Sequence, residues 1–140
     1  MIIVVDGLGD GIGAQLCTKI HQSFGQNVEI VALATNSSAA ERMIKAGADR
    51  GASGENAVRV SIRTGQFILG PIGIVLPNAM MGEITPGMAQ SVMAAEGKKI
   101  LLPVSQPHFI LAGTTSLSLS KIVDEALSLL AGEVKALLEL

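Results

Sequence analysis

Asp6-Gly7-Leu8-Gly9-Asp10-Gly11-Ile12-Gly13 is the most informative stretch of this sequence. It follows the apolar run Ile2 to Val5, which is typical of a buried parallel strand, and it precedes residues with helical spacing. A strand that ends in glycines and leads directly into a helix presents unpaired backbone N–H groups, and the positive end of the helix dipole, to an anion. The stretch therefore predicts a phosphate-binding turn between the first strand and the first helix.

The glycine spacing distinguishes between two kinds of nucleotide turn. A dinucleotide fingerprint G-x-G-x-x-G starting at Gly7 would need a glycine in place of Ile12. Gly7, Gly11 and Gly13 instead form G-x-x-x-G-x-G, which is similar to the cofactor turn of short-chain dehydrogenases. By that resemblance Gly7 allows the tight turn, Gly11 lets a pyrophosphate approach closely, and Gly13 lets the helix pack against the strand.

The resemblance to short-chain dehydrogenases covers about the first forty residues. Those enzymes transfer protons with a Tyr-x-x-x-Lys pair, and this chain contains no tyrosine. The resemblance therefore implies nucleotide binding, with NADP or NAD as the cofactor, and does not imply dehydrogenase catalysis. The turn residues expected to contact the nucleotide are Gly7, Gly9, Asp10, Gly11, Ile12 and Gly13.

Thr35-Asn36-Ser37 follows the second expected strand, Val28 to Ala34. In a βαβ nucleotide site this position meets the adenosine ribose, and an acidic residue there would select the 2′-hydroxyl of NAD. Hydroxyls and an amide at a helix N-terminus suit a 2′-phosphate better, but the same residues also fit plain helix capping. The sequence leaves both interpretations open.

Gly70-Pro71-Ile72-Gly73 lies within the next apolar segment, which starts at Phe67. In a doubly wound sheet this strand lies beside the first one, so the loop at its end forms the other wall of the ligand crevice. Glycines there let a ligand approach the backbone closely, and we expect Gly70, Pro71 and Gly73 to contact it. A bend within a long apolar strand is the alternative explanation.

The remaining segments complete an α/β pattern. Helices are expected over residues 11–24, 38–46, 86–96 and 119–138, and strands or turns over 48–52 and 100–104. Only Ser105-Gln106-Pro107 separates residues 100–104 from the apolar run 109–112, which is too short for a parallel crossover. We therefore predict one Rossmann-like domain over residues 1–140, a three-layer sandwich with a mostly parallel sheet, a C-terminal antiparallel edge strand and a long C-terminal helix.

The composition indicates self-association. A chain of 140 residues and 14.4 kDa fits one domain, yet 49% of its residues are hydrophobic, 16% are charged and the mean hydropathy is +0.51. One small domain does not easily hide so much apolar surface, so we expect a homo-oligomer. Leu129 falls outside the apolar stripe of the last helix, which makes that helix the first candidate contact. Alternatively, a sheet covered on both faces uses up these residues.

Several classes of partner are not expected. A net charge of −2, three Phe and no Trp or Tyr argue against nucleic acid. The charge-free segment from Thr64 to Gly82 contains prolines and glycines, which argues against a membrane span. A single cysteine, Cys17, excludes an internal disulfide, and nothing resembles a signal peptide, so we expect a cytoplasmic protein. His108 has no second ligand at a suitable spacing, so no metal site is expected.

Four carboxylates are candidate general bases, because each falls at or near an expected strand end or loop beside the turn: Asp6, Asp10, Glu55 and Glu83. A buried carboxylate with a raised pKa can abstract a proton. Asp6 and Asp10 fit equally well as caps of the turn through bonds to backbone N–H groups.

Over its full length the chain resembles a small bacterial family of uncharacterised Rossmann-like proteins. The matching pieces are Asp6-Gly7 with the glycine turn, Thr35-Asn36-Ser37, Gly54-Glu55-Asn56-Ala57, Gly70-Pro71-Ile72-Gly73 and Gly82-Glu83-Ile84-Thr85-Pro86. The resemblance implies an α/β fold and supplies no activity. The leading hypothesis is thus a nucleotide-binding domain for NADP or NAD, acting as a sensor, a subunit or a minimal enzyme. The alternatives are a small enzyme acting on a phosphorylated metabolite and a non-catalytic oligomeric scaffold or sensor.

Overall fold

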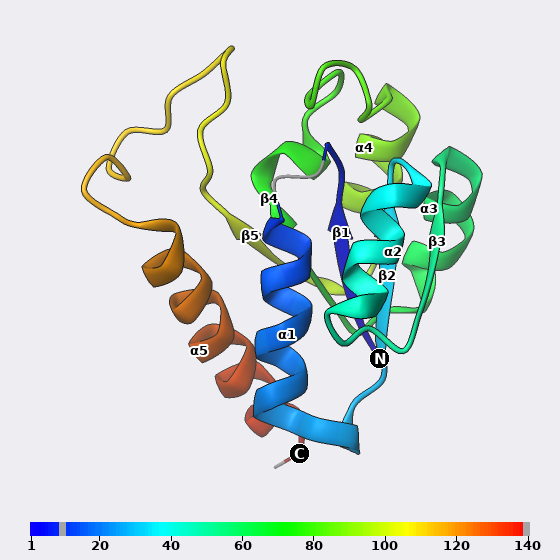
Figure 1. The fold of residues 1–140 in the computed structure, drawn as a ribbon, viewed down its shortest axis with the longest axis vertical. Coiled ribbons are helices and arrows are strands. Elements are labelled where there is room, and N and C mark those ends of the chain that lie inside the picture. The colour runs from blue at the N-terminus through cyan, green and yellow to red at the C-terminus, as the bar shows by residue number, and fades with distance from the viewer. Residues whose placement is uncertain (9–10, 139–140) are drawn as a thin grey trace.

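The computed structural model describes residues 1–8 and 11–138, and these form an α/β fold around one parallel sheet (Figure 1). The strands are β1 (Ile2–Asp6), β2 (Ile30–Ala34), β3 (Arg50–Ser53), β4 (Phe67–Pro71) and β5 (Lys98–Leu102). The helices are α1 (Ile12–Phe24), α2 (Ser37–Lys45), α3 (Glu55–Ser61), α4 (Pro86–Ala94) and α5 (Leu119–Leu138). Short 3₁₀ turns cover Gly25–Asn27, Ile62–Thr64 and Ile72–Val75.

The strand order is β3-β2-β1-β4-β5, with every pairing parallel. This order places β1 at the centre, where Val4 pairs with Ala32 on one side and Leu69 on the other. The chain runs outward from β1 to β3, crosses back to β4, and runs outward again to β5. The order of strands therefore reverses between β1 and β4, and this is where Rossmann-like sheets bind ligands.

Helices cover both faces of the sheet because β1 is apolar on both of its faces. Ile2 and Val4 pack in one core with residues of α1, α2 and α5, while Ile3 and Val5 pack in a second core with residues of α3 and α4. This alternation follows from the two-residue period of a strand. Figure 1 shows α5 alongside α1 on the same face of the sheet.

The predicted antiparallel edge strand is wrong. All the strands that the structure describes are parallel, and residues 103–118 leave β5 as an irregular segment (Figure 1). The chain folds back at Pro107-His108, where Gln106 and Phe109 exchange backbone hydrogen bonds of 3.2 and 3.0 Å. This turn lies four residues beyond the end of β5, and Pro103 directly after β5 has no N–H for a ladder. The apolar run 109–112 consequently does not pair with the sheet.

The long C-terminal helix is confirmed. Its buried stripe consists of Ile122, Val123, Ala126, Leu127 and Leu130. Leu129 lies outside this stripe and is 55% exposed. No helix among residues 1–8 and 11–138 has the length and apolarity needed to cross a membrane.

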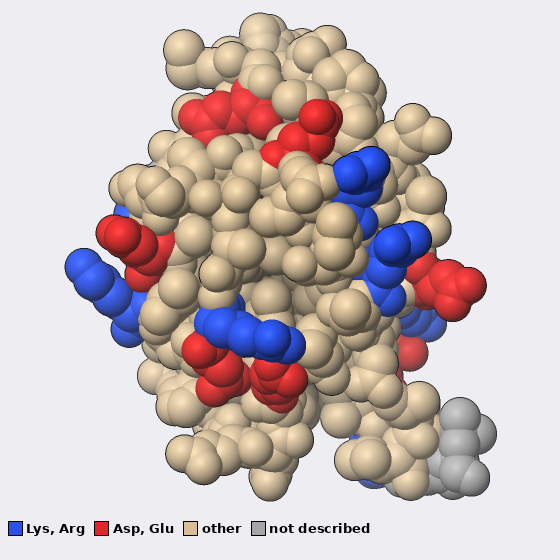
Figure 2. Space-filling model, turned by 90° about the vertical axis from the view of Figure 1, so that its right-hand side faces the viewer, with Lys and Arg blue, Asp and Glu red and all other residues tan. Residues whose placement is uncertain are grey.

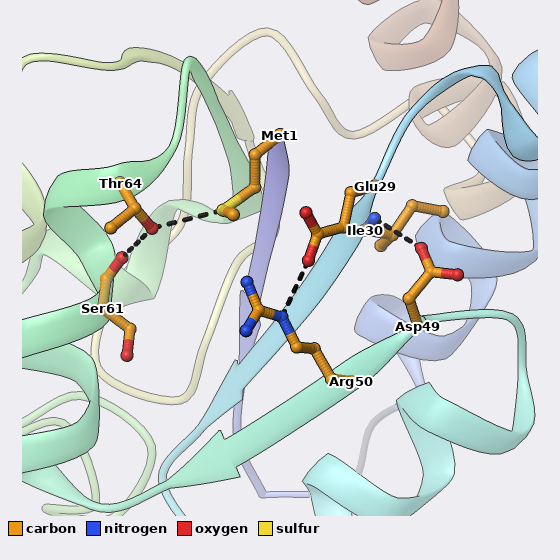
Figure 3. A network of polar contacts seen from close by, with 7 residues as sticks. All are labelled: Met1, Glu29, Ile30, Asp49, Arg50, Ser61 and Thr64. Atoms are coloured by element: carbon orange, nitrogen blue, oxygen red, sulfur yellow. Dashed lines mark hydrogen bonds and ion pairs between the residues drawn. The ribbon is translucent and has the colours of Figure 1, made fainter.

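Polar contacts fix the amino-terminal edge of the sheet (Figure 3). The Arg50 guanidinium pairs with the Glu29 carboxylate at 2.7 Å, and the backbone N–H of Ile30 donates to Asp49 at 2.8 Å. These contacts join the starts of β2 and β3. On the face that carries β3, Figure 2 shows positive and negative side chains interspersed rather than gathered into a field of one sign.

Candidate functional site

The candidate site lies at the carboxyl ends of β1 and β2, beside the start of α1. Asp6 ends β1 and Ala34 ends β2, and the two residues pair in the sheet. The backbone N–H of Thr35 donates to the carbonyl oxygen of Asp6 at 3.2 Å, which extends this pairing beyond the strands. The parallel register therefore brings the glycine turn and the Thr35-Asn36 loop to the same edge of the sheet.

Asp6 is the one buried charged side chain in the described core, with 4% of its surface exposed. Its Oδ1 accepts a hydrogen bond from the Gly7 N–H at 2.7 Å, and its Oδ2 accepts one from the Gly13 N–H at 2.6 Å. Gly13 is the second residue of α1, so this carboxylate satisfies an N–H that the helix itself cannot pair. Both oxygens of Asp6 thus hold the turn closed, which is the capping role foreseen as an alternative to a general base.

Each of the three glycines in the G-x-x-x-G-x-G pattern is required by a different structural constraint. Gly11 is the N-cap of α1 with φ of +82°, a left-handed conformation that favours glycine. A Cβ on Gly13 would lie 2.6 Å from the Met43 sulfur and 2.7 Å from the Asp6 Cβ, so helix packing excludes any side chain there. A Cβ on Gly7 would overlap the side chain of Thr35. These glycines let the turn pack closely against α2 and the Thr35 loop.

The Thr35-Asn36 loop is joined to a distant part of the chain through Glu83. Glu83 Oε1 accepts hydrogen bonds from the Asn36 side-chain amide at 3.0 Å, from the Leu8 N–H at 3.2 Å, and from the Thr35 hydroxyl. Asn36 also caps α2, because its Oδ1 accepts from the Ala39 N–H at 2.8 Å. The structure therefore brings together the glycine turn, the tip of β2 and one predicted carboxylate.

Burial raises the pKa of Glu83, but the hydrogen bonds from Thr35, Asn36 and the Leu8 N–H outweigh that effect, and the pKa lies below its ordinary value. Glu83 is therefore an anion at neutral pH. A general base for chemistry near pH 7 needs a raised pKa, so this environment favours a binding role for Glu83 over a proton-abstracting one.

The segment that carries Glu83 has an unusual backbone. Asn78, Met80 and Met81 have φ of +67°, +57° and +57°, and Gly82 follows with +89°. Residues other than glycine rarely adopt this backbone conformation, so contacts with the rest of the protein must hold the segment in place. The Met80 N–H donates to the Gln106 side chain at 3.3 Å, and Met80 is buried.

The other predicted wall, Gly70 to Gly73, is packed into the fold. A Cβ on Gly70 would overlap the carbonyl oxygen of Val5, so Gly70 allows β4 to lie against β1. A Cβ on Gly73 would lie 2.6 Å from Gln106 Nε2, and both Pro71 and Gly73 are buried. Close packing against the backbone of β1 accounts for Gly70, and contact of this segment with a ligand stays a prediction.

The remaining predicted residues fall in different places. Ile12 is buried as the first residue of α1, and Ser37 is exposed as the first residue of α2. Glu55 accepts a hydrogen bond from the Thr85 hydroxyl at the start of α4, away from the hydrogen bonds that Glu83 accepts. Gly9 and Asp10 lie outside the described residues.

Sequence reasoning missed Arg42 and Gln106. The Arg42 guanidinium lies beside the turn, since a Cβ on Gly11 would be 3.3 Å from its Nη2. The sequence around residues 42 and 106 carries no signal of a binding site. Residue 42 lies within a helix and residue 106 in a loop, and only the tertiary fold brings them near the site.

The structure also describes the single cysteine and the side chains that could ligate a metal. Burial, and to a lesser extent the Asp6 carboxylate, raises the pKa of the Cys17 thiol to about 12, so this thiol is an unreactive core group. Within residues 1–8 and 11–138, no cluster of His, Cys, Asp and Glu has the geometry to hold a metal ion.

Residues 1–135 match a protein family described as "Domain of unknown function (DUF3842)". This match spans nearly the whole chain and agrees with the resemblance to an uncharacterised family that the sequence motifs indicate. Comparisons with curated proteins and with solved structures gave no match.

Proposed function

The chain belongs to the DUF3842 family, and we propose that it is a nucleotide-binding domain that takes NAD or NADP at the carboxyl ends of β1 and β2. The convergence of Leu8, Thr35, Asn36 and Glu83 beside the N-terminus of α1 is the observation that carries this proposal. Polar groups from three separate segments meet at the edge where a Rossmann-like sheet binds a nucleotide.

The diphosphate of the nucleotide would lie against the start of α1. Gly11 has no side chain to keep a phosphate away from the backbone there. The Arg42 guanidinium lies beside Gly11, so a positive charge is close to the expected phosphate position. Asp6 already satisfies the Gly13 N–H. Phosphate binding at this turn therefore relies on Arg42 and the remaining N–H groups rather than on the whole helix terminus.

The carboxylate of Glu83 favours NAD over NADP. This carboxylate accepts hydrogen bonds from the Thr35 and Asn36 side chains, where the ribose of the nucleotide is expected. A carboxylate accepts hydrogen bonds from ribose hydroxyls, whereas it repels a 2′-phosphate. Glu83 therefore shifts the expected preference away from the 2′-phosphate, which the Thr35 and Asn36 side chains alone would suit, toward the 2′-hydroxyl of NAD.

A catalytic role for the site has less support. The two oxygens of Asp6 are held by backbone N–H groups, and the pKa of Glu83 is lowered rather than raised. We therefore propose a binding domain, a sensor or a subunit, located in the cytoplasm, where the single reduced Cys17 is expected to persist.

Isothermal titration calorimetry with NADH, NADPH, ATP and FAD tests the proposal. NADH should bind more tightly than NADPH, and Glu83→Gln should narrow the difference, because it removes the charge that repels the 2′-phosphate. Arg42→Met should weaken both dinucleotides by about tenfold, the effect of losing one charge-assisted contact. Absence of binding by all four compounds up to about 1 mM, an affinity of only about −4 kcal/mol, would overturn the proposal.

A further inference from the structure

A cavity of about 570 Å³ lies between α3 and α4. Arg59 and Arg63 line it from α3 and the 3₁₀ turn that follows, and Gln90 and Ser91 line it from α4. None of the residues that form the Glu83 cluster lines this cavity. We call it the α3–α4 groove.

The two arginines of the α3–α4 groove lack the carboxylate partner that the sequence offers. Glu55 precedes Arg59 by four residues, a spacing at which such side chains usually pair on a helix. Glu55 instead accepts a hydrogen bond from Thr85, and Arg59 donates to the Asn56 amide oxygen at 2.5 Å. In the part of the chain that the structure describes, no ion pair involves Arg59 or Arg63.

The wall opposite the arginines is open and carries hydrogen-bond donors. Gly87 leaves room for the Glu55 carboxylate where α4 approaches α3, because a Cβ on Gly87 would lie 2.5 Å from Glu55 Oε1. Gln90 and Ser91 add an amide and a hydroxyl, and both can donate to an oxyanion. The apolar part of the groove includes Val60, which is 51% exposed although it is aliphatic.

We propose that the α3–α4 groove binds a small organic anion, in which a carboxylate or phosphate group is attached to an apolar body. The oxyanion would lie between Arg59 and Arg63, which stand one helical turn apart and present planar donors suited to carboxylate and phosphate oxygens. The apolar body would cover Val60. A cavity of this volume is within the range of small-molecule sites.

Glu55 sets the orientation of the bound anion. It lines an adjoining hollow of about 380 Å³ together with Asn56, Arg59 and Gly87. Its negative charge disfavours an oxyanion at that end of the groove, so the anionic group should lie toward Arg63. This site is independent of the proposed nucleotide site.

Amide NMR titrations with phenyl phosphate, benzoate and phenol test the proposal. Phenol has the same aromatic body without the anionic group, and it should bind at least about tenfold more weakly than the better of the two anions. The anions should cause saturable shifts at residues 59–63 and 87–95. Comparing phenyl phosphate with benzoate identifies which oxyanion the groove prefers.

A double variant, Arg59→Met with Arg63→Met, should weaken binding of the preferred anion by at least about tenfold. Arg50→Met is the matched control, because Arg50 is an exposed arginine that is already paired with Glu29 outside the groove, and it should leave binding unchanged. Both arginines of the groove are exposed, so the variant should keep its fold, which far-UV circular dichroism checks. No saturable shift by either anion up to about 10 mM, shifts centred on residues 7–13, or equal losses in the Arg50 control would each overturn the proposal.

Discussion

At the scale of single residues, Asp6 links the sheet to the first helix. Its two oxygens accept from N–H groups on either side of the glycine turn, at 2.7 and 2.6 Å, while the side chain is buried. Hydrogen bonds to a charged group are stronger than neutral ones, and the loss of a buried acceptor leaves its donor unsatisfied. Asp6 is therefore expected to stabilise the turn more than any exposed carboxylate does.

Asp6→Asn should lower the free energy of unfolding by about 2 kcal/mol, because the new amide group turns one acceptor into a donor that faces an N–H. Urea denaturation followed by circular dichroism measures this loss. Asp49→Asn is the control, since Asp49 accepts a single backbone bond, from Ile30, in a partly buried place. A loss at Asp6 no greater than the loss at Asp49 would contradict the assigned role.

Glu83 should contribute stability in a pH-dependent way. Its pKa is lower in the folded protein than its ordinary value of about 4.3, so the contribution is complete above that ordinary value and is lost as the pH falls through the lower, folded value. The wild type should be more stable than Glu83→Gln at pH 7, and the difference should shrink as the pH falls below about 4. Thermal unfolding across this range measures it, and a difference that grows in acid would refute the assignment.

Single residues also show how much of the candidate site could be predicted from the sequence. The glycine turn and the Thr35-Asn36 loop could be predicted, because a glycine pattern and a polar strand tip are local signals. The partnership of Glu83 with Thr35 could not, since 48 residues separate them and the contact depends on a segment with left-handed backbone at Met80 and Met81. Arg42 likewise reaches the turn only because α2 packs beside α1.

At the scale of elements, α1 ends in glycines at both termini, and this allows a matched test of the turn. Gly11 and Gly25 both have left-handed φ, +82° and +60°, but only Gly11 belongs to the candidate site. Replacing Gly11 by alanine should cost about 1 kcal/mol of stability, because alanine is strained in the left-handed conformation, and replacing Gly25, which has ψ of −134°, should cost at least as much.

Gly11→Ala should additionally weaken NADH by several fold, since its methyl group would point toward the Arg42 guanidinium. Gly25→Ala should bind NADH as the wild type does. Calorimetric titration of both variants checks this prediction. If both variants lose affinity equally, the loss reflects stability rather than the site, and the role of Gly11 is refuted.

The C-terminal helix allows a test of self-association. Leu129 is 55% exposed beside an apolar hollow formed with β5, and the end of the same helix exposes Leu138 as well. We expect copies of the chain to associate through this helix. Leu129→Asp should shift the protein toward monomers in analytical ultracentrifugation, whereas Ser128→Asp, an exposed neighbour on the same helix, should not. A wild type that stays monomeric at high concentration would contradict the expectation.

Elements were predictable where a pattern is long or where its neighbours in the sequence support it. The stripe of α5 follows from its helical periodicity, and the short apolar run of β1 could be predicted because a glycine turn and a helical pattern follow it. The apolar run 109–112 carries the same signal as a strand but forms none, because the turn at Pro107 and the proline after β5 keep it away from the sheet. Four apolar residues do not pair without a partner strand within reach.

At the scale of the whole molecule, the strand order β3-β2-β1-β4-β5 determines which residues come together at each end of the sheet. It places the glycine turn at the carboxyl end of the central strand β1. The Thr35 loop follows the neighbouring strand β2, and Glu83 contacts both the turn and this loop. The salt bridges and backbone bonds of the opposite edge, near Arg50 and Asp49, hold the starts of the strands and take no part in the site. The contacts at the starts of the strands are therefore separate from the proposed binding site at their carboxyl ends.

The most direct test of the proposed nucleotide site is a residue-resolved NMR titration of the protein with NADH. We predict saturable amide shifts concentrated at Gly7, Leu8, Gly11 to Gly13, Thr35, Asn36 and Glu83, with the residues of the amino-terminal edge, such as Ile30 and Arg50, unchanged. Saturation without shifts in the glycine turn, or no saturable shift at all, would contradict the claim that this edge of the sheet is a nucleotide site.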